Sequence, residues 1–381
     1  MRKYGFPYKG GKWKLAEPIV RLLPHAENLW DVFCGGGAIA DRARCTGKFN
    51  NIHVNDIQPG QAAAVKQLIT GNIKLKKEWI SHEEFFERRL KDPLVRMLWS
   101  FGNNGTSYMY SREIEPWKRA IFYIRAFNNY GPMREIGIEQ EPITMAWINK
   151  NMQYCIEKYL AFIKPKLGIT PEVEEEFNKL VSSGKVDLNF SAGVCRVQHA
   201  TMQIERLSDN AEAMKSLMML NNMNVDCKFK MCESLERIQS LERIQSIESI
   251  QPLERIDKNI NVTSTELDYR DIKGIAKNDV CFLDPPYEDT GGYGTGIGKF
   301  DSAAFWQWVR ELPCIALTSS YKAPDDFISI AEFEHRSSIN DAGNKLVIEK
   351  VFLHKEQEEL YKKKTGWSGV VRDKSGQLDL F

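Results

Sequence analysis

The stretch from Asn28 to Ile57 constrains the fold of this chain more than any other. The apolar run 28–33 ends at four residues, Cys34-Gly35-Gly36-Gly37, which break it. Residues 38–47 suit a helix, and residues 51–57 form a second strand-like run. Two strands joined through a helix are normally parallel, so the pattern predicts the first unit of a strand–helix–strand sheet.

Further strand-like runs lie near the end of the chain, at 279–284, 314–320 and 345–355. Together with the first unit they predict an α/β fold with a largely parallel sheet that is buried on both faces. From about residue 81 to residue 222 helical stretches dominate, such as 116–127 and 146–163. The chain therefore reads as one α/β domain interrupted by a mostly helical insert.

A short repeat follows the insert, at residues 234–256, where SLERIQ-SLERIQ-SIESIQ-PLERI places an apolar residue at every third position. Each step of three residues falls about 60° short of a full helical turn, so the apolar stripe cannot stay on one face of a helix. This argues against a long coiled coil, which needs a heptad. We expect a surface connection, with a partner-binding element as the alternative. The expected divisions are 1–80, 81–230 (insert), 231–257 (repeat), 258–355 and 356–381, the last a flexible tail.

Composition excludes several classes of protein. The 381 residues include 52 Lys and Arg against 51 Asp and Glu, so the chain is no histone-like polycation. It has no apolar run of membrane-spanning length, and its start lacks a secretory signal. The eight cysteines form no CxxC pair and no zinc-type cluster. We therefore expect a cytoplasmic protein with reduced thiols and no metal site.

The tetrapeptide Asp284-Pro285-Pro286-Tyr287 directly follows a buried strand, which places it at the edge where open α/β sheets bind ligands. The exocyclic amine of a nucleobase is a poor nucleophile because its lone pair is delocalised into the ring. Two acceptors that bind its two hydrogens draw the nitrogen towards tetrahedral geometry, and the Asp284 carboxylate and Pro285 carbonyl can supply them. The prolines fix the turn, and Tyr287 offers a ring for stacking on an extruded base.

The glycine turn at 34–37 lets a ligand approach the backbone closely, although its spacing is not the GxGxxG of dinucleotide-binding folds. Asp56 follows the second strand 20 residues after Gly36, the usual distance to a carboxylate that binds ribose hydroxyls. Cys34 is not expected to act as a nucleophile, because thiolate-dependent cytosine C5 methyltransferases use a Pro-Cys motif that is missing here.

The chain resembles the Dam-like D12 class (α group) of DNA N6-adenine methyltransferases. The motifs that carry the resemblance run in the expected order: PYKGGKWKL, DVFCGGG, VNDI, an insert, LDYRDI, DPPY and KLVIEKVFLH. It covers about 1–75 and 262–355. The resemblance implies a Rossmann-like fold, S-adenosylmethionine as the cofactor, and direct transfer of its methyl group to N6 of an adenine flipped out of duplex DNA, in some relatives as part of restriction–modification.

The resemblance also implies roles for individual residues. Lys12 would contact the methionine carboxylate of the cofactor, Asp56 its ribose and Asp271 its adenine. The remaining positions expected to bind the cofactor are Tyr8, Phe33, Gly35, Gly37 and Asp284, and the catalytic residues would be Asp284, Pro285, Pro286 and Tyr287.

The insert is expected to recognise DNA. Its segment SFGNNGTSYMYSREIEPWKRA combines polar, aromatic and basic residues, which can read base edges and position phosphates. The candidate contacts are Asn103, Asn104, Tyr108, Arg112 and Lys118, with an ordinary solvated helix as the alternative. The last five residues resemble the peptide by which bacterial DNA enzymes bind the replicative sliding clamp, with Gln377, Leu378, Leu380 and Phe381 as the contacts.

Three alternatives stay open on the sequence alone. An N4-cytosine methyltransferase would use similar chemistry, although Ser usually replaces Asp in its tetrapeptide. A methyltransferase of RNA or protein is disfavoured by the motif order, and a catalytically idle DNA-binding module by the retention of every polar motif.

Overall fold

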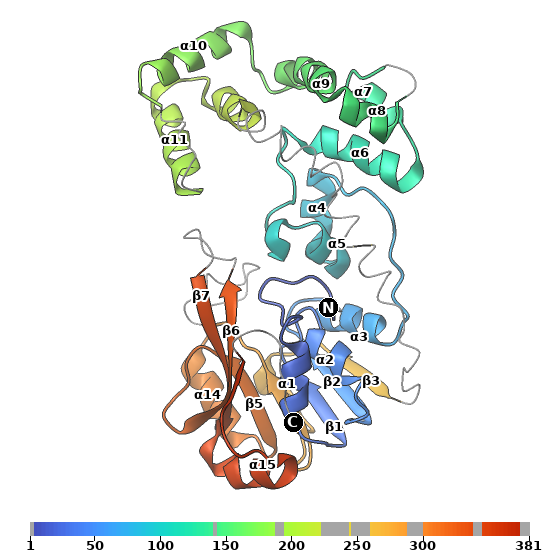
Figure 1. Ribbon diagram of the computed structural model, residues 1–381, viewed down its shortest axis with the longest axis vertical. Coiled ribbons are helices and arrows are strands. Elements are labelled where there is room, and N and C mark those ends of the chain that lie inside the picture. The colour runs from blue at the N-terminus through green and yellow to red at the C-terminus, as the bar shows by residue number, and fades with distance from the viewer. Residues whose placement is uncertain are drawn as a thin grey trace.

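A computed structural model describes residues 4–139, 143–186, 194–221, 244, 260–287, 300–337 and 345–373. Its lower half in Figure 1 holds a sheet with helices against it, and its upper half is helical. The strands are β1 (Asn28–Asp31), β2 (Asn51–Asn55), β3 (Asn261–Thr265), β4 (Val280–Leu283), β5 (Ile315–Ser320), β6 (Phe327–Ser337), β7 (Lys345–His354) and β8 (Val371–Asp373).

The helices of the sheet-containing half are α1 (Ala16–Leu22), α2 (Ala38–Ala43), α3 (Gln61–Ile69), η2 (Tyr269–Asp271), α14 (Ser302–Glu311), η3 (Lys355–Gln357) and α15 (Glu358–Thr365). The chain between α3 and β3 forms α4 (His82–Arg88), α5 (Pro93–Leu98), η1 (Phe101–Asn103), α6 (Glu115–Phe127), α7 (Gly131–Glu135), α8 (Met145–Lys150), α9 (Met152–Lys166), α10 (Pro171–Ser182) and α11 (Val194–Leu207). Helix α5 begins at Pro93 because the Asp92 side chain accepts from the amides of Leu94 and Val95. In the part of the chain that the structure describes, no helix is long and apolar enough to cross a membrane.

The sheet has the order β3-β2-β1-β4-β5-β7-β6-β8. Strands β3 to β5 are parallel, whereas β7 runs antiparallel to both β5 and β6. From β1 the chain crosses to β2 on one side, and from β4 it crosses to β5 on the other, so β1 and β4 flank a topological switch point. Ligands of open α/β sheets bind at such a point, outside the carboxyl ends of the strands.

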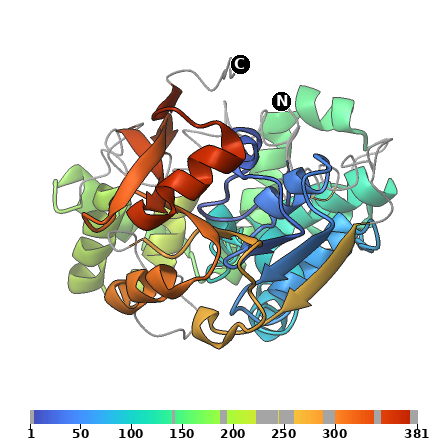
Figure 2. The ribbon, with the colours of Figure 1, turned by 90° about the horizontal axis from the view of Figure 1, so that it is seen from below.

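Both faces of the central strands are buried, as the apolar runs predicted. In β4 and β5 successive side chains alternate between two hydrophobic clusters: Val280, Phe282 and Ile315 join one, and Cys281 and Ala316 join the other. The first cluster includes α1, α2 and α3, and the second includes α14. Figure 2 shows the sheet between its covering helices from below. An α/β fold with a largely parallel sheet is confirmed.

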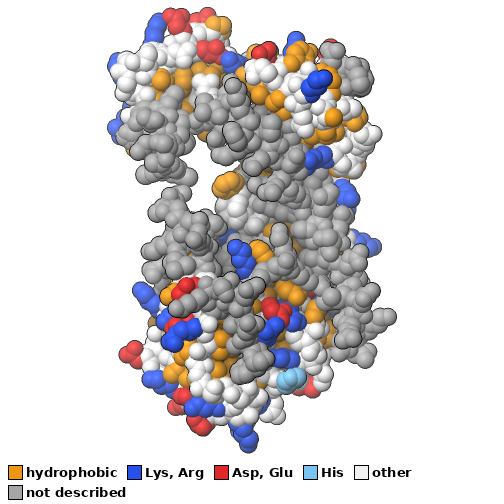
Figure 3. All heavy atoms as spheres, viewed as in Figure 1, with side chains coloured by type: hydrophobic (Ala, Val, Ile, Leu, Met, Phe, Trp, Pro, Cys, Tyr) orange, Lys and Arg blue, Asp and Glu red, His pale blue; other side chains and the backbone are white. Residues whose placement is uncertain are grey.

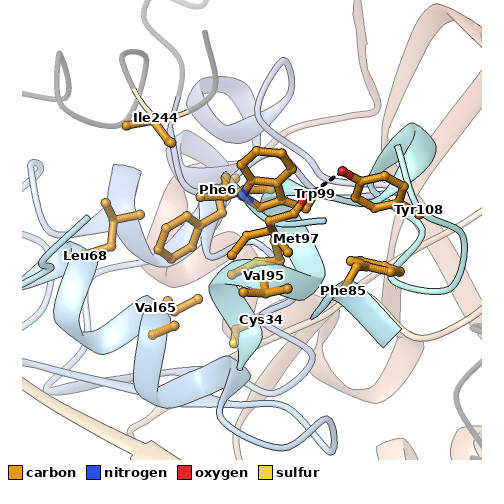
Figure 4. Close-up of a cluster of buried hydrophobic side chains, with 14 of the residues drawn as sticks. Phe6, Cys34, Val65, Leu68, Phe85, Val95, Met97, Trp99, Tyr108 and Ile244 are labelled. Carbon is orange, nitrogen blue, oxygen red and sulfur yellow. Dashed lines mark hydrogen bonds between the residues drawn. The ribbon is translucent and has the colours of Figure 1, made fainter. Parts of the chain in front are cut away.

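The first helices of the insert contact the sheet domain through buried side chains, in addition to the covalent connection. In Figure 4, Val95 and Met97 of α5 lie near Val65 of α3 and Cys34 of the glycine turn. Arg96 is buried, and its guanidinium donates to the side-chain oxygen of Gln61 at the start of α3. The first helices of the insert therefore belong to the same core as the sheet.

The prediction of a flexible tail from residue 356 is wrong for residues 356–373, which form part of the fold. Helix α15 packs on the sheet domain because Tyr361, 1% exposed, fits the main cluster and donates its hydroxyl to the carbonyl of Leu22. Strand β8 pairs with β6. The charged residues that suggested a tail occupy the exposed side of an amphipathic helix. Of the repeat at 234–256, the structure describes only Ile244, which is buried in the same cluster and labelled in Figure 4.

Substitution of Gly37 tests the packing of the glycine turn against Val65. Its φ is +76°, and a Cβ atom there would lie 2.4 Å from a methyl carbon of Val65. Gly47 has φ of +65° with no atom within 4 Å of the same position. Gly47→Ala should therefore cost only the backbone strain of about 1–2 kcal/mol, while Gly37→Ala should cost about 1–3 kcal/mol more through overpacking. Urea unfolding measures both; equal losses would contradict the packing described.

Candidate active site at the switch point

The glycine turn after β1 is held by the next strand and by a buried carboxylate. The Cys34 amide donates to the carbonyl of Asn55, and the Gly35 amide donates to Oδ2 of Asp56, at 3.0 Å. Oδ1 of Asp56 accepts from the Gln58 amide. Asp56 is 8% exposed and fixes the turn at the carboxyl end of β2, while its expected contact with ribose hydroxyls stays a prediction.

A second carboxylate, Asp31, lies beneath the turn at the end of β1. It is 2% exposed, and its Oδ2 accepts from the Ala40 amide in α2. Burial, together with the charges of Asp284 and Asp56, raises the pKa of Asp31 to about 7. The edge of the sheet thus carries a concentration of negative charge around the glycines.

The N-terminal segment, residues 4–15, packs directly on this turn. The Phe6 amide donates to the carbonyl of Gly36, and the Gly5 amide donates to Oδ2 of Asp41 in α2. A Cβ atom on Gly36 would lie 2.5 Å from the Phe6 carbonyl oxygen, so only glycine permits this approach. The ring of Tyr8 lies against Gly35, and its hydroxyl accepts from the Gln58 side chain.

The segment then delivers Lys12 to the tetrapeptide after β4. The Lys12 ammonium lies 2.8 Å from Oδ2 of Asp284 and 3.1 Å from Oε1 of Glu349 in β7. It also lies 5.2 Å from the centre of the Tyr287 ring. Burial alone would lower the pKa of Lys12, but the two carboxylates raise it well above its usual value. Lys12 is therefore a permanent cation in this site.

The expected contact of Lys12 with the methionine carboxylate of the cofactor stays a prediction. In this structure its ammonium pairs with Asp284 and Glu349. The physical reason is that Lys12 is only 8% exposed, and a buried ammonium requires anionic partners. The two carboxylates supply them within the protein.

Asp284 is tied on both of its oxygens. Lys12 holds Oδ2, and the Tyr287 hydroxyl donates to Oδ1 at 3.0 Å. Burial raises the pKa of Asp284; the Lys12 charge opposes this rise and the Glu349 charge adds to it. The Asp284 side chain is 18% exposed, against 8% for Lys12 and 5% for Glu349, so it is the member of this cluster most open to a ligand.

Three members of the cluster, Glu349, Ser319 and Tyr321, were missed by the sequence analysis. Ser319 is the last residue but one of β5, and its hydroxyl lies 3.0 Å from the Tyr287 hydroxyl and 2.5 Å from Oε1 of Glu349. Tyr321 follows, with its ring edge-on to Tyr287 at 4.7 Å between centres. A signal for Glu349 was present, since an acidic residue stands inside the apolar run Val347 to Leu353.

The region expected to hold the adenine of the cofactor is aromatic. Phe33, next to the glycine turn, lies 5.7 Å between ring centres from both Tyr269 and Phe305. Asp271 sits in η2 beside them, but its side chain is exposed. The structure therefore groups Phe33 with the motif that contains Asp271, while the role of Asp271 stays a prediction.

The candidate DNA contacts divide into buried and accessible residues. Tyr108 is 7% exposed and donates its hydroxyl to the Ile80 carbonyl, and Lys118 is 8% exposed in α6. The assignment of these two residues to DNA is wrong for this conformation because both are packed inside the insert. The Asn104 side chain accepts from the amides of Thr106 and Ser107 and so builds the turn.

Arg112 is exposed, and Asn103 is partly exposed with its carbonyl accepting from the Lys9 amide. On the face shown in Figure 3, Lys and Arg side chains of the lower half lie among Asp and Glu side chains. Of the described residues, no group of three or more His, Cys, Asp or Glu side chains is arranged to hold a metal ion. Cys34 is buried, and burial raises the pKa of its thiol well above the usual value, which disfavours a thiolate.

Lys12→Met tests the shared ion pair. The variant leaves two carboxylates facing each other in a site largely removed from water, and breaking such a pair typically costs about 3–5 kcal/mol of unfolding free energy. The loss should be largest at high pH, because the raised pKa of Asp284 rises further without the cation and protonation relieves the repulsion as pH falls. Urea unfolding between pH 5 and pH 9 measures it, with exposed Lys14→Met as the control. A pH-independent loss equal in both variants would refute the pairing.

Comparison with known proteins agrees with this geometry. Residues 8–128 match the family model described as D12 class N6 adenine-specific DNA methyltransferase. A search of curated proteins returns no match. The matched region contains Tyr8, Lys12, the glycine turn and Asp56, and the tetrapeptide after β4 meets it at the switch point. The N-terminal third of the chain is thus similar to the D12 class of N6-adenine DNA methyltransferases, a family that uses S-adenosylmethionine.

Proposed function

We propose that Asp284 and the Pro285 carbonyl hold the exocyclic amine of a flipped adenine during methyl transfer. The observation that carries the proposal is the 2.8 Å pair between Lys12 and Asp284, because it joins the segment packed on the glycine turn to the tetrapeptide. Asp284 follows β4 directly, and β1 with its glycine turn is the neighbouring strand. An amine held there faces a cofactor bound along the turn.

The chemistry required of the protein is positioning and charge stabilisation. The cofactor supplies an electrophilic methyl group on a cationic sulfur. As N6 forms its bond to this carbon, the carbon–sulfur bond breaks and the amine becomes cationic. Asp284 then accepts a hydrogen bond that strengthens with the developing charge, and after methylation the amine passes one proton to the Asp284 carboxylate and from there to water. The partly exposed position of Asp284 supports contact with the base.

The residues around the glycine turn fit S-adenosylmethionine. Gly35 and Gly36 let Tyr8 and Phe6 approach the backbone of the turn closely, which places Tyr8 beside the proposed cofactor site. Asp31 and Asp56 place carboxyl oxygens at this end of the strands as acceptors for an ammonium group and for ribose hydroxyls. We propose Tyr8, Phe33, Gly35, Gly37 and Asp56 as the cofactor site, with Asp271 as a further candidate.

Recognition of duplex DNA is assigned to the insert, with Arg112 and Asn103 as the accessible candidates. Phe101, 65% exposed, stands next to Asn103 and adds an aromatic surface suited to unstacked bases. The proposed setting is the cytoplasm of a bacterial or phage-infected cell. Gln377, Leu378, Leu380 and Phe381 lie outside the described residues, so clamp binding stays a hypothesis.

Asp284→Asn should lower the single-turnover methylation rate by at least about 100-fold, as expected when a positioned acceptor is lost. Tritiated methyl transfer to a DNA pool of random sequence measures the rate. Calorimetry should show unchanged cofactor binding, and the exposed Asp325→Asn is the matched control. Methylation by Asp284→Asn at the wild-type rate would contradict the assigned role.

Asp56→Ala should weaken cofactor binding by about 10- to 100-fold, the effect of losing a charge-assisted hydrogen bond. Asp279→Ala is the control because it also removes a buried carboxylate. Asp279 accepts from the Asn28 and Trp30 side chains and precedes β4, so it lies at the amino ends of the strands, away from the site. Calorimetry on both variants, with thermal melts to compare their folding, separates binding from stability. Equal affinity in the two variants would remove Asp56 from the site.

A further inference from the structure

Glu349 is a buried carboxylate for which neither the sequence motifs nor the family comparison suggests a role. It lies in β7, outside the matched residues 8–128, and is 4% exposed. Its Oε1 atom lies 2.8 Å from the Tyr287 hydroxyl, 2.5 Å from the Ser319 hydroxyl and 3.1 Å from the Lys12 ammonium. Such convergence on one oxygen holds its partners closely in place.

The placement of Glu349 is unfavourable for folding alone. It puts a second carboxylate beside Asp284, and among the described residues both carboxylates share the ammonium of Lys12. Removing charged groups from water is costly, and apolar side chains of similar volume often replace buried ion pairs without loss of stability. A stabilising role therefore does not explain why an acid stands in this strand.

The contacts form a closed ring around Asp284. The Lys12 ammonium pairs with both carboxylates, and the single proton of the Tyr287 hydroxyl is shared between Oδ1 of Asp284 and Oε1 of Glu349. Because Glu349 contacts both Lys12 and Tyr287, it holds these two side chains in place when the Asp284 side chain rotates. Each oxygen of Asp284 retains a second lone pair that can accept from a substrate amine.

We propose that Glu349 is a positioning residue for methyl transfer, which acts through Lys12 and Tyr287 to hold the Asp284 carboxylate in the orientation that accepts the adenine amine. The inference rests on the proposed role of Asp284. By competing for the same ammonium, Glu349 also keeps Lys12 from neutralising Asp284 fully, so that Asp284 remains a strong acceptor.

The pH dependence of methylation gives this role a signature. Asp284 faces Lys12 from the N-terminal segment, Asp31 from β1, Glu349 from β7, and Tyr287 and Tyr321 from the loops that follow β4 and β5. Glu349 raises the pKa of Asp284, so removing its charge should lower that pKa. Burial raises the pKa of Tyr287 well above its usual value, so the Tyr287 hydroxyl stays protonated and does not obscure the acid limb.

Glu349→Gln keeps the size of the side chain and one acceptor oxygen but removes the charge. We expect the single-turnover rate at neutral pH to fall about 10- to 100-fold, the cost of misplacing a reacting group by about 1 Å. The acid limb of the rate profile should move by about one unit to lower pH. Cofactor affinity, measured by calorimetry, should stay within about twofold.

Two further variants separate this role from a structural one. Ser319→Ala removes a donor to Glu349 without changing the charge, so its acid limb should stay at the wild-type position. Glu349→Asp restores the charge and should recover the acid limb and part of the rate. If Glu349→Gln loses only thermal stability, with wild-type rate and profile in the folded fraction, the inference is wrong. This outcome would leave the proposed function standing, because Asp284→Asn tests that function separately.

Discussion

The pairing of one buried ammonium with two carboxylates is the interaction on which the site depends. Lys12 comes from the N-terminal segment, Asp284 from the end of β4 and Glu349 from β7, so the pair joins three parts of the chain that are far apart in sequence. Each group would be costly to bury alone. Their pairing fixes the place of the tetrapeptide relative to the glycine turn.

The sheet provides the frame for this arrangement. Parallel strands β1 and β4 are neighbours, and the chain leaves them in opposite directions, which opens the edge at their carboxyl ends. The glycines allow the N-terminal segment to approach that edge, and Asp31 and Asp56 give it negative charge. The carboxyl ends of these strands thus combine close approach of the backbone with the buried carboxylates to which we assign the binding of cofactor and amine.

Much of the fold could be predicted from the sequence because its signals are local. The apolar runs at 28–33 and 279–284 and the break at Gly35 determine strands and a turn whatever lies around them. The DNA contacts could not be predicted in the same way. Tyr108 lies in a segment whose composition is typical of a recognition loop. Its ring is nevertheless buried by tertiary packing, which the sequence does not reveal. Lys12 likewise acquired its partners from strands at the other end of the sequence.

The central claim, that Asp284 accepts the amine of an extruded adenine beside the glycine turn, is tested most directly by a crystal structure with S-adenosylhomocysteine and cognate duplex DNA, once long-read sequencing has given the methylated site. The account predicts an adenine N6 atom about 3 Å from an Asp284 oxygen, with Lys12 still bound to Glu349. An adenine left in the helix, or one bound with Asp284 turned away from it, would contradict the account.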